Sequence, residues 1–506
     1  MIGGYLYIWR AAFAAIVLLI ILSIYIATPL GGDQQVSVAA AHQADFHGSF
    51  PQNVVESWDM RGLLCKFVMY IFYRTAIVFT DFFDKNSFEM AFRSVAAITV
   101  LTLLAVGALV SRRFLRKNRI EPMDAFFVFA ISALTITFRC TFQAEDMACW
   151  VCILGTACAL SESRLLQIVG GVLLSLTAGF KGITAVMGVL GCVAVFLLAR
   201  DDRRRLWTIG ISFFLGTIAL AGSLILWAPT EVQDLRNATL FNDSFGPGLF
   251  HRLKILVIGV SLEWPQIPIL LPGEAAAIYC FLSLWRRRAV MSMLIFAAMW
   301  LLPFTVVSIQ GKGFDYHFLA LWPVAAGSVV AALSFMRATP EYNKNWERIL
   351  LAAPVVMGLM CATVNPFWWL DNTRYTRDSS SIFVRRNAVW SERNEYADLL
   401  KHYQLREQPN ILYLDWGISA YYFGTKSYSR YFFPFPIHRL SPKVIKSAIH
   451  DTTLEEVMRY KGEFVLWHYR WLRFTNRPDL DPLYAKLERE YVPVYENDLF
   501  RLLRRR

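Results

Sequence analysis

Long apolar runs separated by short polar segments follow one another along most of this 506-residue chain. Each run is close to the roughly 20 residues that an α-helix needs to cross the hydrocarbon core of a bilayer. The pattern predicts about eleven membrane-spanning helices, at about 7–30, 88–110, 122–139, 147–163, 165–180, 183–199, 206–227, 269–285, 289–308, 317–336 and 349–367. The first run is too long for a signal peptide, so we expect it to remain as an anchor.

One further apolar segment, residues 62–82, is long enough to cross the membrane but carries Lys66 and Arg74. Charged side chains are costly in hydrocarbon. Counting this segment as a span would also move every later loop to the other side of the membrane. We therefore interpret it as an interfacial or re-entrant helix on the outer face.

Basic residues gather in four connections, after the second, sixth, eighth and tenth predicted spans. The clusters lie within 112–119, 200–205, 286–288 and 337–348, all on the same side as the N-terminus. Because excess Lys and Arg mark cytoplasmic loops, we expect that side to be cytoplasmic. The loop at 31–61 and the C-terminal region then lie on the outer face, which would be the periplasmic face of a bacterial inner membrane.

The composition agrees with a membrane protein and changes how the charge is interpreted. Hydrophobic residues make up 56% of the chain and charged residues 18%, whereas soluble proteins have about 25% charged residues. Much of the net charge of +12 belongs to the cytoplasmic clusters, so it does not indicate a nucleic-acid partner. The eight cysteines lie almost all in apolar runs, which favours small packing residues over a metal or redox site.

Residues 368–506 have a mixed polar and aromatic composition and form a second region. Strand patterns begin at Asn410 and Gly462, and a final hairpin is expected from Val492 to Leu503. Helices are expected at 442–449, 454–460 and 481–490. Because strands and helices alternate, this region is predicted to be a small extracytoplasmic α/β domain. Residues 1–367 would form the polytopic α-helical transmembrane module.

Acidic residues at the predicted outer face are the first candidates for chemistry. Asp33 lies just outside the first span, where a carboxylate either acts as a general base on an incoming hydroxyl or is an ordinary solvated acid. Glu145 and Asp146 open the fourth span. They either bind a divalent cation or orient a sugar, or they stabilise the first turn of a helix through its dipole.

Basic residues at the same face form a second group. Lys181 lies in a Gly-Phe-Lys-Gly turn between two spans, and Lys312 lies in a glycine-rich segment before the tenth span. Each either binds a phosphate as a point charge or extends to the membrane interface. His317, at the head of the tenth span, either contacts phosphate or caps the helix. Arg139 is a further cation in the turn between the third and fourth spans.

Several catalytic signatures are absent from the sequence. It contains no Walker loop, dinucleotide-binding fingerprint, HExxH motif or nucleophile elbow. Its ionisable residues gather at one face, whereas transporters hold their substrates near the membrane midplane. The pattern therefore disfavours a lipid-carrier flippase or transporter, which is the non-enzymatic alternative.

Together these features resemble the GT-C superfold of integral-membrane glycosyltransferases, in particular the bacterial relatives of dolichyl-phosphate-mannose protein mannosyltransferases and of the lipid A aminoarabinose transferase. The resemblance covers most of the chain and rests on four stretches, at 33–81, 143–147, 179–182 and 311–323. Aromatic motifs at 413–417, 421–424 and 429–431 are similar to the extracytoplasmic tails of bacterial members.

The resemblance implies an inverting transfer of a sugar from a polyprenyl-phosphate donor to a lipid, glycan or protein acceptor. Asp33, in the loop 31–87, inherits the role of catalytic base. Glu145 and Asp146 would orient the sugar or acceptor, or hold a divalent metal as a cofactor. The residues implied to bind the donor phosphate are Lys181, Lys312, His317 and Arg139. A lipid-linked glycan ligase or polymerase would share this donor chemistry and is the second alternative.

Two departures from the family pattern affect these implied roles. The family often has two adjacent acids after the first span, but Gln34 follows Asp33 here, which leaves Asp45 or Asp59 as competing bases. The family's proline-rich segment before the interfacial helix is replaced by Trp58-Asp-Met-Arg-Gly. Acceptor contacts in that segment are therefore not carried over.

Overall fold

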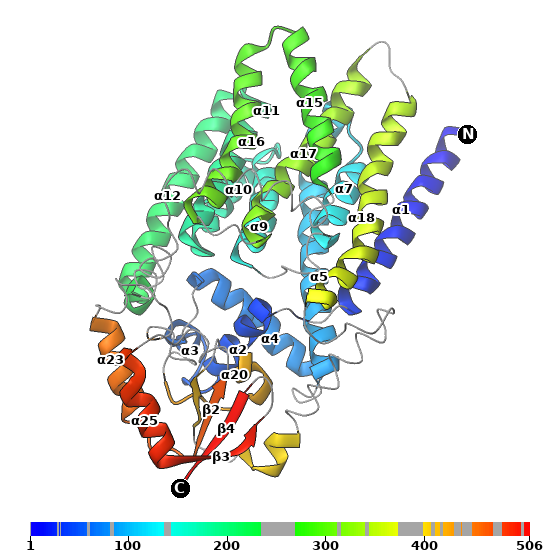
Figure 1. Cartoon of the computed structure of the whole chain (residues 1–506). Helices are drawn as coiled ribbons and strands as arrows, with labels where there is room; N and C mark the ends of the chain where they lie inside the picture. The colour runs from blue at the N-terminus through cyan, green and yellow to red at the C-terminus, as the bar shows by residue number, and fades with distance from the viewer. Residues whose placement is uncertain are drawn as a thin grey trace. The chain divides into compact units, whose positions relative to one another are not determined.

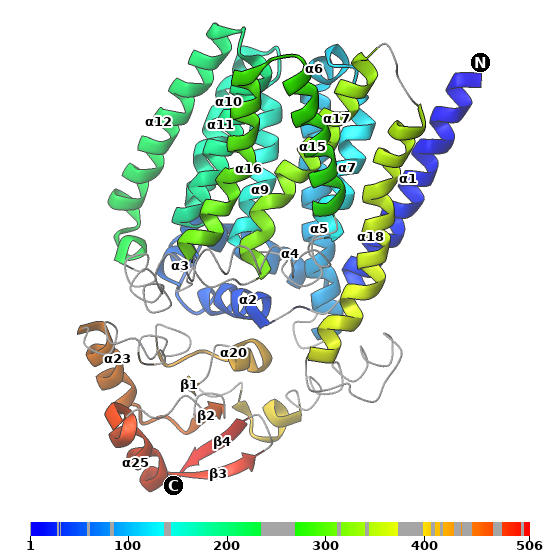
Figure 2. The ribbon, with the colours of Figure 1, turned by 45° about the horizontal axis from the view of Figure 1, so that its top comes forward.

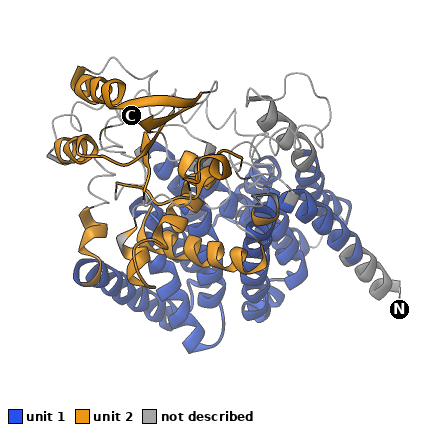
Figure 3. Ribbon diagram, turned by 90° about the horizontal axis from the view of Figure 1, so that it is seen from below, with its two compact units in different colours: residues 1–29, 89–226, 247–385 blue, residues 30–88, 227–246, 386–506 orange. Residues whose placement is uncertain are grey.

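The computed structural model of the chain divides, by its internal contacts, into two compact units. It describes residues 2–27, 30, 32–57, 61–80, 85–135, 143–233, 269–310, 315–339, 344–372, 398–405, 410–414, 418–429, 437, 448–468, 478–496 and 500–506. Figure 3 colours the first unit blue (residues 1–29, 89–226 and 247–385) and the second orange (residues 30–88, 227–246 and 386–506). We call them the transmembrane unit and the mixed unit. The mixed unit joins the first loop to the C-terminal region.

Every predicted span coincides with a helix. These helices are α1 (Ile2–Ala27), α5 (Lys85–Val110), α7 (Pro122–Thr135), α9 (Ala144–Ala159), α10 (Arg164–Leu176), α11 (Ala185–Ala199), α12 (Arg203–Trp227), α15 (Leu270–Arg286), α16 (Val290–Gln310), α17 (Trp322–Ala338) and α18 (Lys344–Asn372). Figures 1 and 2 show them running in broadly the same direction within the transmembrane unit. The prediction of a polytopic α-helical membrane protein is confirmed.

Length and composition alone do not separate these helices from the segment that was predicted not to cross, because α9, α15 and α18 also fall outside the two groups that follow. Within the described ranges, five stretches are long and apolar enough to span a membrane: 87–110, 182–199, 203–227, 290–308 and 318–338. Shorter apolar helices lie at 12–26, 122–135 and 164–179. Helix α4 (Leu63–Phe79), with 17 residues, is in neither group.

The start of the tenth span is less regular than the apolar pattern predicted. Residues Asp315–Leu321 form the 3₁₀ helix η3, and α17 begins only at Trp322. Pro323 lies in the first turn of α17. Its missing N–H costs little there, because the first amides of a helix have no acceptor within the helix. The proline therefore marks the change from η3 to the regular α-helix.

Helix α9, which carries two candidate acids, is held by close packing of its neighbours. It packs against α10, α11 and η3. Helices α10 and α11 approach so closely at Gly188 that a Cβ at this position would clash with the carbonyl oxygen of Leu174. Small residues are the usual means by which membrane helices come this close. The backbone around the candidate site is therefore fixed by direct helix-to-helix contact.

The mixed unit combines three first-loop helices with a C-terminal α/β region. The first-loop helices are α2 (Gly32–Ala44), α3 (Gln52–Glu56) and α4. The helices of the C-terminal region are α20 (Ile418–Phe423), α23 (Ala448–Met458) and α25 (Asp481–Glu490). Strands β1 (Leu412–Leu414), β2 (Phe464–His468), β3 (Tyr491–Glu496) and β4 (Phe500–Arg505) form one sheet in the order β1-β2-β4-β3. β1 and β2 are parallel, whereas β4 pairs antiparallel with both β2 and β3.

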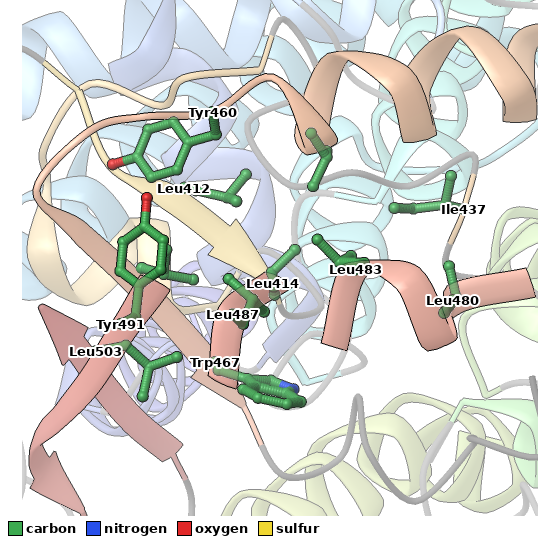
Figure 4. Close-up of a cluster of buried hydrophobic side chains, with 12 residues drawn as sticks. Leu412, Leu414, Ile437, Tyr460, Trp467, Leu480, Leu483, Leu487, Tyr491 and Leu503 are labelled. Atoms are coloured by element: carbon green, nitrogen blue, oxygen red, sulfur yellow. The ribbon is translucent and has the colours of Figure 1, made fainter. Parts of the chain in front are cut away.

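Apolar side chains from the sheet and its helices form the core of this α/β region. Leu483 and Leu487 lie one turn apart on α25, so both face the same side of the helix. They pack with Leu414 and Trp467 from the two parallel strands, and all four side chains are buried (Figure 4). The predicted small C-terminal α/β arrangement is confirmed.

One secondary-structure prediction in this region is wrong. Helices were expected separately at 442–449 and 454–460; residues 442–447 lie outside the described residues, but α23 runs without a break through 448–458, so the expected break between the two helices is wrong. Its buried residues His450, Thr453 and Val457 recur at helical spacing and so form one continuous face. Burial of this face outweighs the weak helix propensity of the intervening Asp-Thr-Thr sequence.

Candidate active site

The first turn of α9 carries two buried acids. Glu145 and Asp146 follow Ala144 and are 1% and 0% exposed. The positive end of the helix dipole favours negative charge at this position. The dipole alone does not offset the cost of removing a carboxylate from water, so such groups need specific partners.

Lys181 is the partner of Glu145. Its Nζ donates to Oε1 of Glu145 at 2.7 Å. The Lys181 side chain is 21% exposed, whereas the Glu145 side chain is 1% exposed. The pair therefore has one member inside the helix bundle and the other at an accessible edge, where an anionic ligand is able to approach the ammonium group.

The turn that carries Lys181 is closed by hydrogen bonds. It lies between the short 3₁₀ helices η1 (Thr177–Gly179) and η2 (Gly182–Thr184). The backbone N–H of Lys181 donates to Oγ1 of Thr184 at 3.2 Å, and the N–H of Thr184 donates to the Lys181 carbonyl at 2.8 Å. This reciprocal capping fixes the direction in which the lysine leaves the backbone.

Asp146 is positioned by its own helix. Its Oδ1 accepts a hydrogen bond of 3.1 Å from Nε1 of Trp150, one turn further along α9. Trp150 is itself buried. Hydrogen bonds to a charged acceptor are stronger than those between neutral groups, so the indole holds the carboxylate in one orientation.

This donor set fits a divalent cation poorly. The Glu145 carboxylate is bonded to an ammonium group, and the Asp146 carboxylate is bonded to an indole N–H. Across the described parts of the chain, His, Cys, Asp and Glu form no group of three that could hold a metal ion.

Four other predicted site residues lie wholly or partly outside the described residues. Asp33 belongs to the first turn of α2, and His317 belongs to η3, but the side chains of both are outside the described part of the chain. Arg139 and Lys312 lie in ranges that are not described at all. The roles expected of these four residues stay predictions.

Asp45, a competing base, takes part in a hydrogen-bonded network of the mixed unit. Its Oδ1 accepts from the Tyr70 hydroxyl at 2.8 Å, and its Oδ2 accepts from Nη1 of Arg74 at 3.1 Å. Burial, together with the hydrogen bond to Asp45, raises the pKa of Tyr70. The negative charge of Asp45 raises the pKa of Arg74. Asp59, the other competitor, lies outside the described residues.

Helix α2, whose first turn contains Asp33, is hydrogen-bonded to the C-terminal region through side chains that the sequence did not point to. Gln43 Nε2 donates to the Thr425 carbonyl at 2.8 Å, and its Oε1 accepts from the Ser427 amide at 2.9 Å. His42 Nε2 lies 2.6 Å from the carbonyl of Gly424. The only sequence signal was the Tyr421-Tyr-Phe-Gly motif, whose Gly424 has a φ of +60° that glycine adopts readily.

The fold agrees with the GT-C type that the sequence led us to expect. In its architecture the chain is similar to ArnT from Cupriavidus metallidurans, solved bound to undecaprenyl phosphate. The TM-score is 0.56 and the sequence identity 12%, over 99% of this chain and 98% of that one.

A second, more distant similarity is to an oligosaccharyltransferase from Archaeoglobus fulgidus, solved in complex with Zn and sulfate. The TM-score is 0.47 and the identity 14%, over 89% of this chain and 68% of the other. No family profile matches the chain, and no curated protein matches it in sequence. The similarity to ArnT is therefore one of fold, at 12% sequence identity.

Proposed function

We propose that the protein is a glycosyltransferase that transfers a sugar from a polyprenyl-phosphate carrier to a lipid, glycan or protein acceptor. The observation that supports this most is the similarity along nearly the whole chain to ArnT, which was solved with undecaprenyl phosphate bound. The paired Glu145 and Lys181 add a charged group at an accessible edge of the helix bundle. Both features suit a donor with an anionic head and an apolar chain.

In the proposed reaction, an acceptor hydroxyl oxygen attacks the anomeric carbon of the donor sugar. The bond from that carbon to the phosphate oxygen breaks, and the polyprenyl phosphate leaves with the bonding electrons. A single displacement of this kind inverts the anomeric centre. Lys181 would stabilise the charge of the leaving phosphate, with Lys312, His317 and Arg139 as further predicted contacts. No step requires a metal.

The acceptor's proton would pass to Asp33. Asp45 is a weaker candidate for this role, because Tyr70 and Arg74 already bond both of its carboxylate oxygens. A general base needs an oxygen within hydrogen-bond reach of the acceptor hydroxyl. Glu145 would hold Lys181 in place, and Asp146, fixed by Trp150, would orient the sugar or the acceptor.

The test is sugar transfer by the full-length protein in membrane vesicles that contain a polyprenyl-phosphate sugar. Glycolipids from cells with and without the protein would first identify a usable donor and acceptor by mass. Asp33→Asn should then lower the turnover rate by at least about 10²-fold, a typical contribution of general base catalysis. Asp45→Asn is the matched control and should retain most of the activity. Near-normal turnover by the Asp33 variant would refute the assignment of the base.

The proposal also requires the loop 31–87 and the domain 368–506 to lie on the outer face, and the basic loops to be cytoplasmic. Accessibility tags at the C-terminus and in the 112–119 connection should report opposite sides of the membrane. A cytoplasmic C-terminus would contradict the proposed location of the reaction.

A further inference from the structure

A cavity of about 450 Å³ lies inside the transmembrane unit, apart from the candidate active site. It is lined by residues of α5, α7, α9, α11, α16 and α17. Most of its lining is apolar, and Leu104, Phe129, Ile153, Leu190 and Phe296 are examples. Sites that bind small ligands have volumes of roughly 300–1,000 Å³ and similarly apolar walls. In size and lining, this partly open cavity is comparable to such sites.

The cavity is near the opposite end of the same helices that carry the candidate active site. On α9, Glu145 is in the first turn, whereas Thr156, which lines the cavity, is eleven residues later. This separation corresponds to roughly 16 Å along a helix that rises 1.5 Å per residue. Because Cys152 and Pro323 also line it, the cavity reaches from the middle of the bundle to the end that has the basic connections.

Several polar side chains are gathered at that end of the lining. Ser111, Asn118, Arg200 and Ser292 lie at or near helix ends, whereas Thr156, Ser328 and Ser334 are polar lining residues within their helices. Nη1 of Arg200 donates to Oγ of Ser292 at 2.9 Å. The Arg200 side chain is 48% exposed, and its ion pair with Asp201 is long, at 3.8 Å. Such a pair contributes little, so the guanidinium group is able to bind another anion.

The backbone of α17 borders open space within this cavity. Gly327 lines the cavity, and a Cβ at this position would have no atom within 4 Å. Protein interiors are normally close-packed, because atoms that border an empty space lose their contacts on one side. An apolar space of this size is therefore expected to be filled by an apolar group from outside the chain.

We propose that the cavity binds an acyl chain of an anionic phospholipid, with the lipid phosphate at Arg200. The apolar walls would hold the chain, and the polar rim would hold the head group. Basic pockets between membrane helices at the cytoplasmic face bind acidic lipid head groups in this way. A polyprenyl phosphate has the same chemistry, but one acyl chain suits the limited volume better. This proposal does not depend on sugar transfer.

The test is native mass spectrometry of the full-length protein titrated with phosphatidylglycerol, phosphatidylcholine or a polyprenyl phosphate. Phosphatidylglycerol should bind more tightly than the other two lipids. Arg200→Gln should weaken phosphatidylglycerol binding by about fivefold, the loss expected for one basic residue at an acidic lipid surface. It should leave phosphatidylcholine binding unchanged.

Filling the cavity gives a second and independent test. Gly327→Leu should remove the bound lipid, because the new side chain occupies the space of the acyl chain. Gly210→Leu is the matched control. Gly210 lies on the exposed side of α12, and a Cβ at this position would also have no atom within 4 Å, but Gly210 does not line the cavity. The control should bind lipid as the unsubstituted protein does.

Three results would overturn the proposal. Equal affinity for phosphatidylcholine would show that the head group is not recognised. Tighter binding of the polyprenyl phosphate, lost in the Arg200 variant, would assign the cavity to that lipid. A Gly327→Leu protein with unchanged lipid binding and a higher melting temperature would show that the cavity is empty packing space. If Gly327→Leu does not fold, Gly327→Ala and Arg200→Gln still decide between these results.

Discussion

Two lysine–glutamate pairs in the described part of the chain have nearly equal lengths but very different surroundings. In the mixed unit, Lys66 Nζ lies 2.6 Å from Glu231 Oε2, and the side chains are 2% and 1% exposed. In the transmembrane unit, Lys181 lies 2.7 Å from Glu145, and the lysine is 21% exposed. The two N–O distances are nearly the same, so what distinguishes the pairs is the exposure of the lysine side chain.

Lys66 is fully enclosed by the protein. Besides Glu231, its Nζ also donates to the carbonyl oxygen of Ser57 at 2.8 Å. It therefore ties together α4, the end of α3 and the segment that follows α12. A charged pair this deeply buried is inaccessible to a ligand, so we interpret it as a structural clamp. The Lys181 pair, with one accessible member, is the one suited to binding.

The largest expected effect is on stability and concerns the clamp. Lys66→Met should lower the free energy of unfolding by about 3–5 kcal/mol, because it leaves the Glu231 charge buried without compensation. The measurement is thermal unfolding of the reconstituted protein. Adding Glu231→Leu should recover most of the loss, because an apolar pair often replaces a buried ion pair without cost. A double variant as unstable as the single one would disprove the clamp interpretation.

The second effect is on catalysis and concerns the accessible pair. Lys181→Met should lower the rate of sugar transfer by about 10²-fold, as removal of a charge-stabilising donor typically does. Its melting temperature should also fall, because Glu145 is left buried without its lysine, but by less than that of Lys66→Met, because water is able to reach the position of the partly exposed Lys181. Lys181→Arg, which keeps the charge, should retain more activity. A large loss of stability with an unchanged rate would make Lys181 a second clamp.

The hydrophobic pattern predicted the spans and α4, but it could not predict either pair. Spans are visible in sequence because each depends on a local run of about 20 apolar residues. Lys66 and Glu231 are 165 positions apart, and Lys181 and Glu145 are 36 apart. Such pairs form only through tertiary packing. In the sequence, Lys66 indicated only that its helix would not cross the membrane.

The residues of the candidate site were predictable from local sequence, but the contact between them was not. Glu145 and Lys181 were both selected because they interrupt apolar runs at the predicted outer face. Their bond depends on α9 and α11 being neighbours, which no local pattern specifies. The attachment of α2 to residues 424–427 is a similar case. In the sequence, Gln43 is an ordinary residue of a helix-prone stretch, and its bond to the Thr425 carbonyl forms only in the folded chain.

A smaller effect is expected from the residue that positions Asp146, next to the accessible pair. Trp150→Phe keeps an aromatic ring but removes the N–H that Asp146 accepts. Hydrogen bonds to charged groups contribute about 1.5–3 kcal/mol to stability, so the free energy of unfolding should fall by about 2 kcal/mol. The rate of sugar transfer should fall modestly. Trp300→Phe is the matched control, because that indole donates at the same 3.1 Å distance to the neutral hydroxyl of Ser328. Equal losses of stability in the two variants would mean that the charge of Asp146 does not strengthen its hydrogen bond to Trp150.

The smallest effect, and the most direct test of the comparison, is the response to salt. Raising the ionic strength from 0.1 M to 1 M shortens the screening length from about 10 Å to about 3 Å. Mobile ions screen a pair only where they are able to approach it, so the Lys181 pair should weaken while the Lys66 pair does not. The destabilisation caused by Lys181→Met should therefore shrink in high salt, by less than about 1 kcal/mol, and that caused by Lys66→Met should remain constant. Melting curves of both variants at the two salt concentrations measure this. If both losses shrink equally, ions reach both lysines, and exposure does not distinguish the binding pair from the clamp.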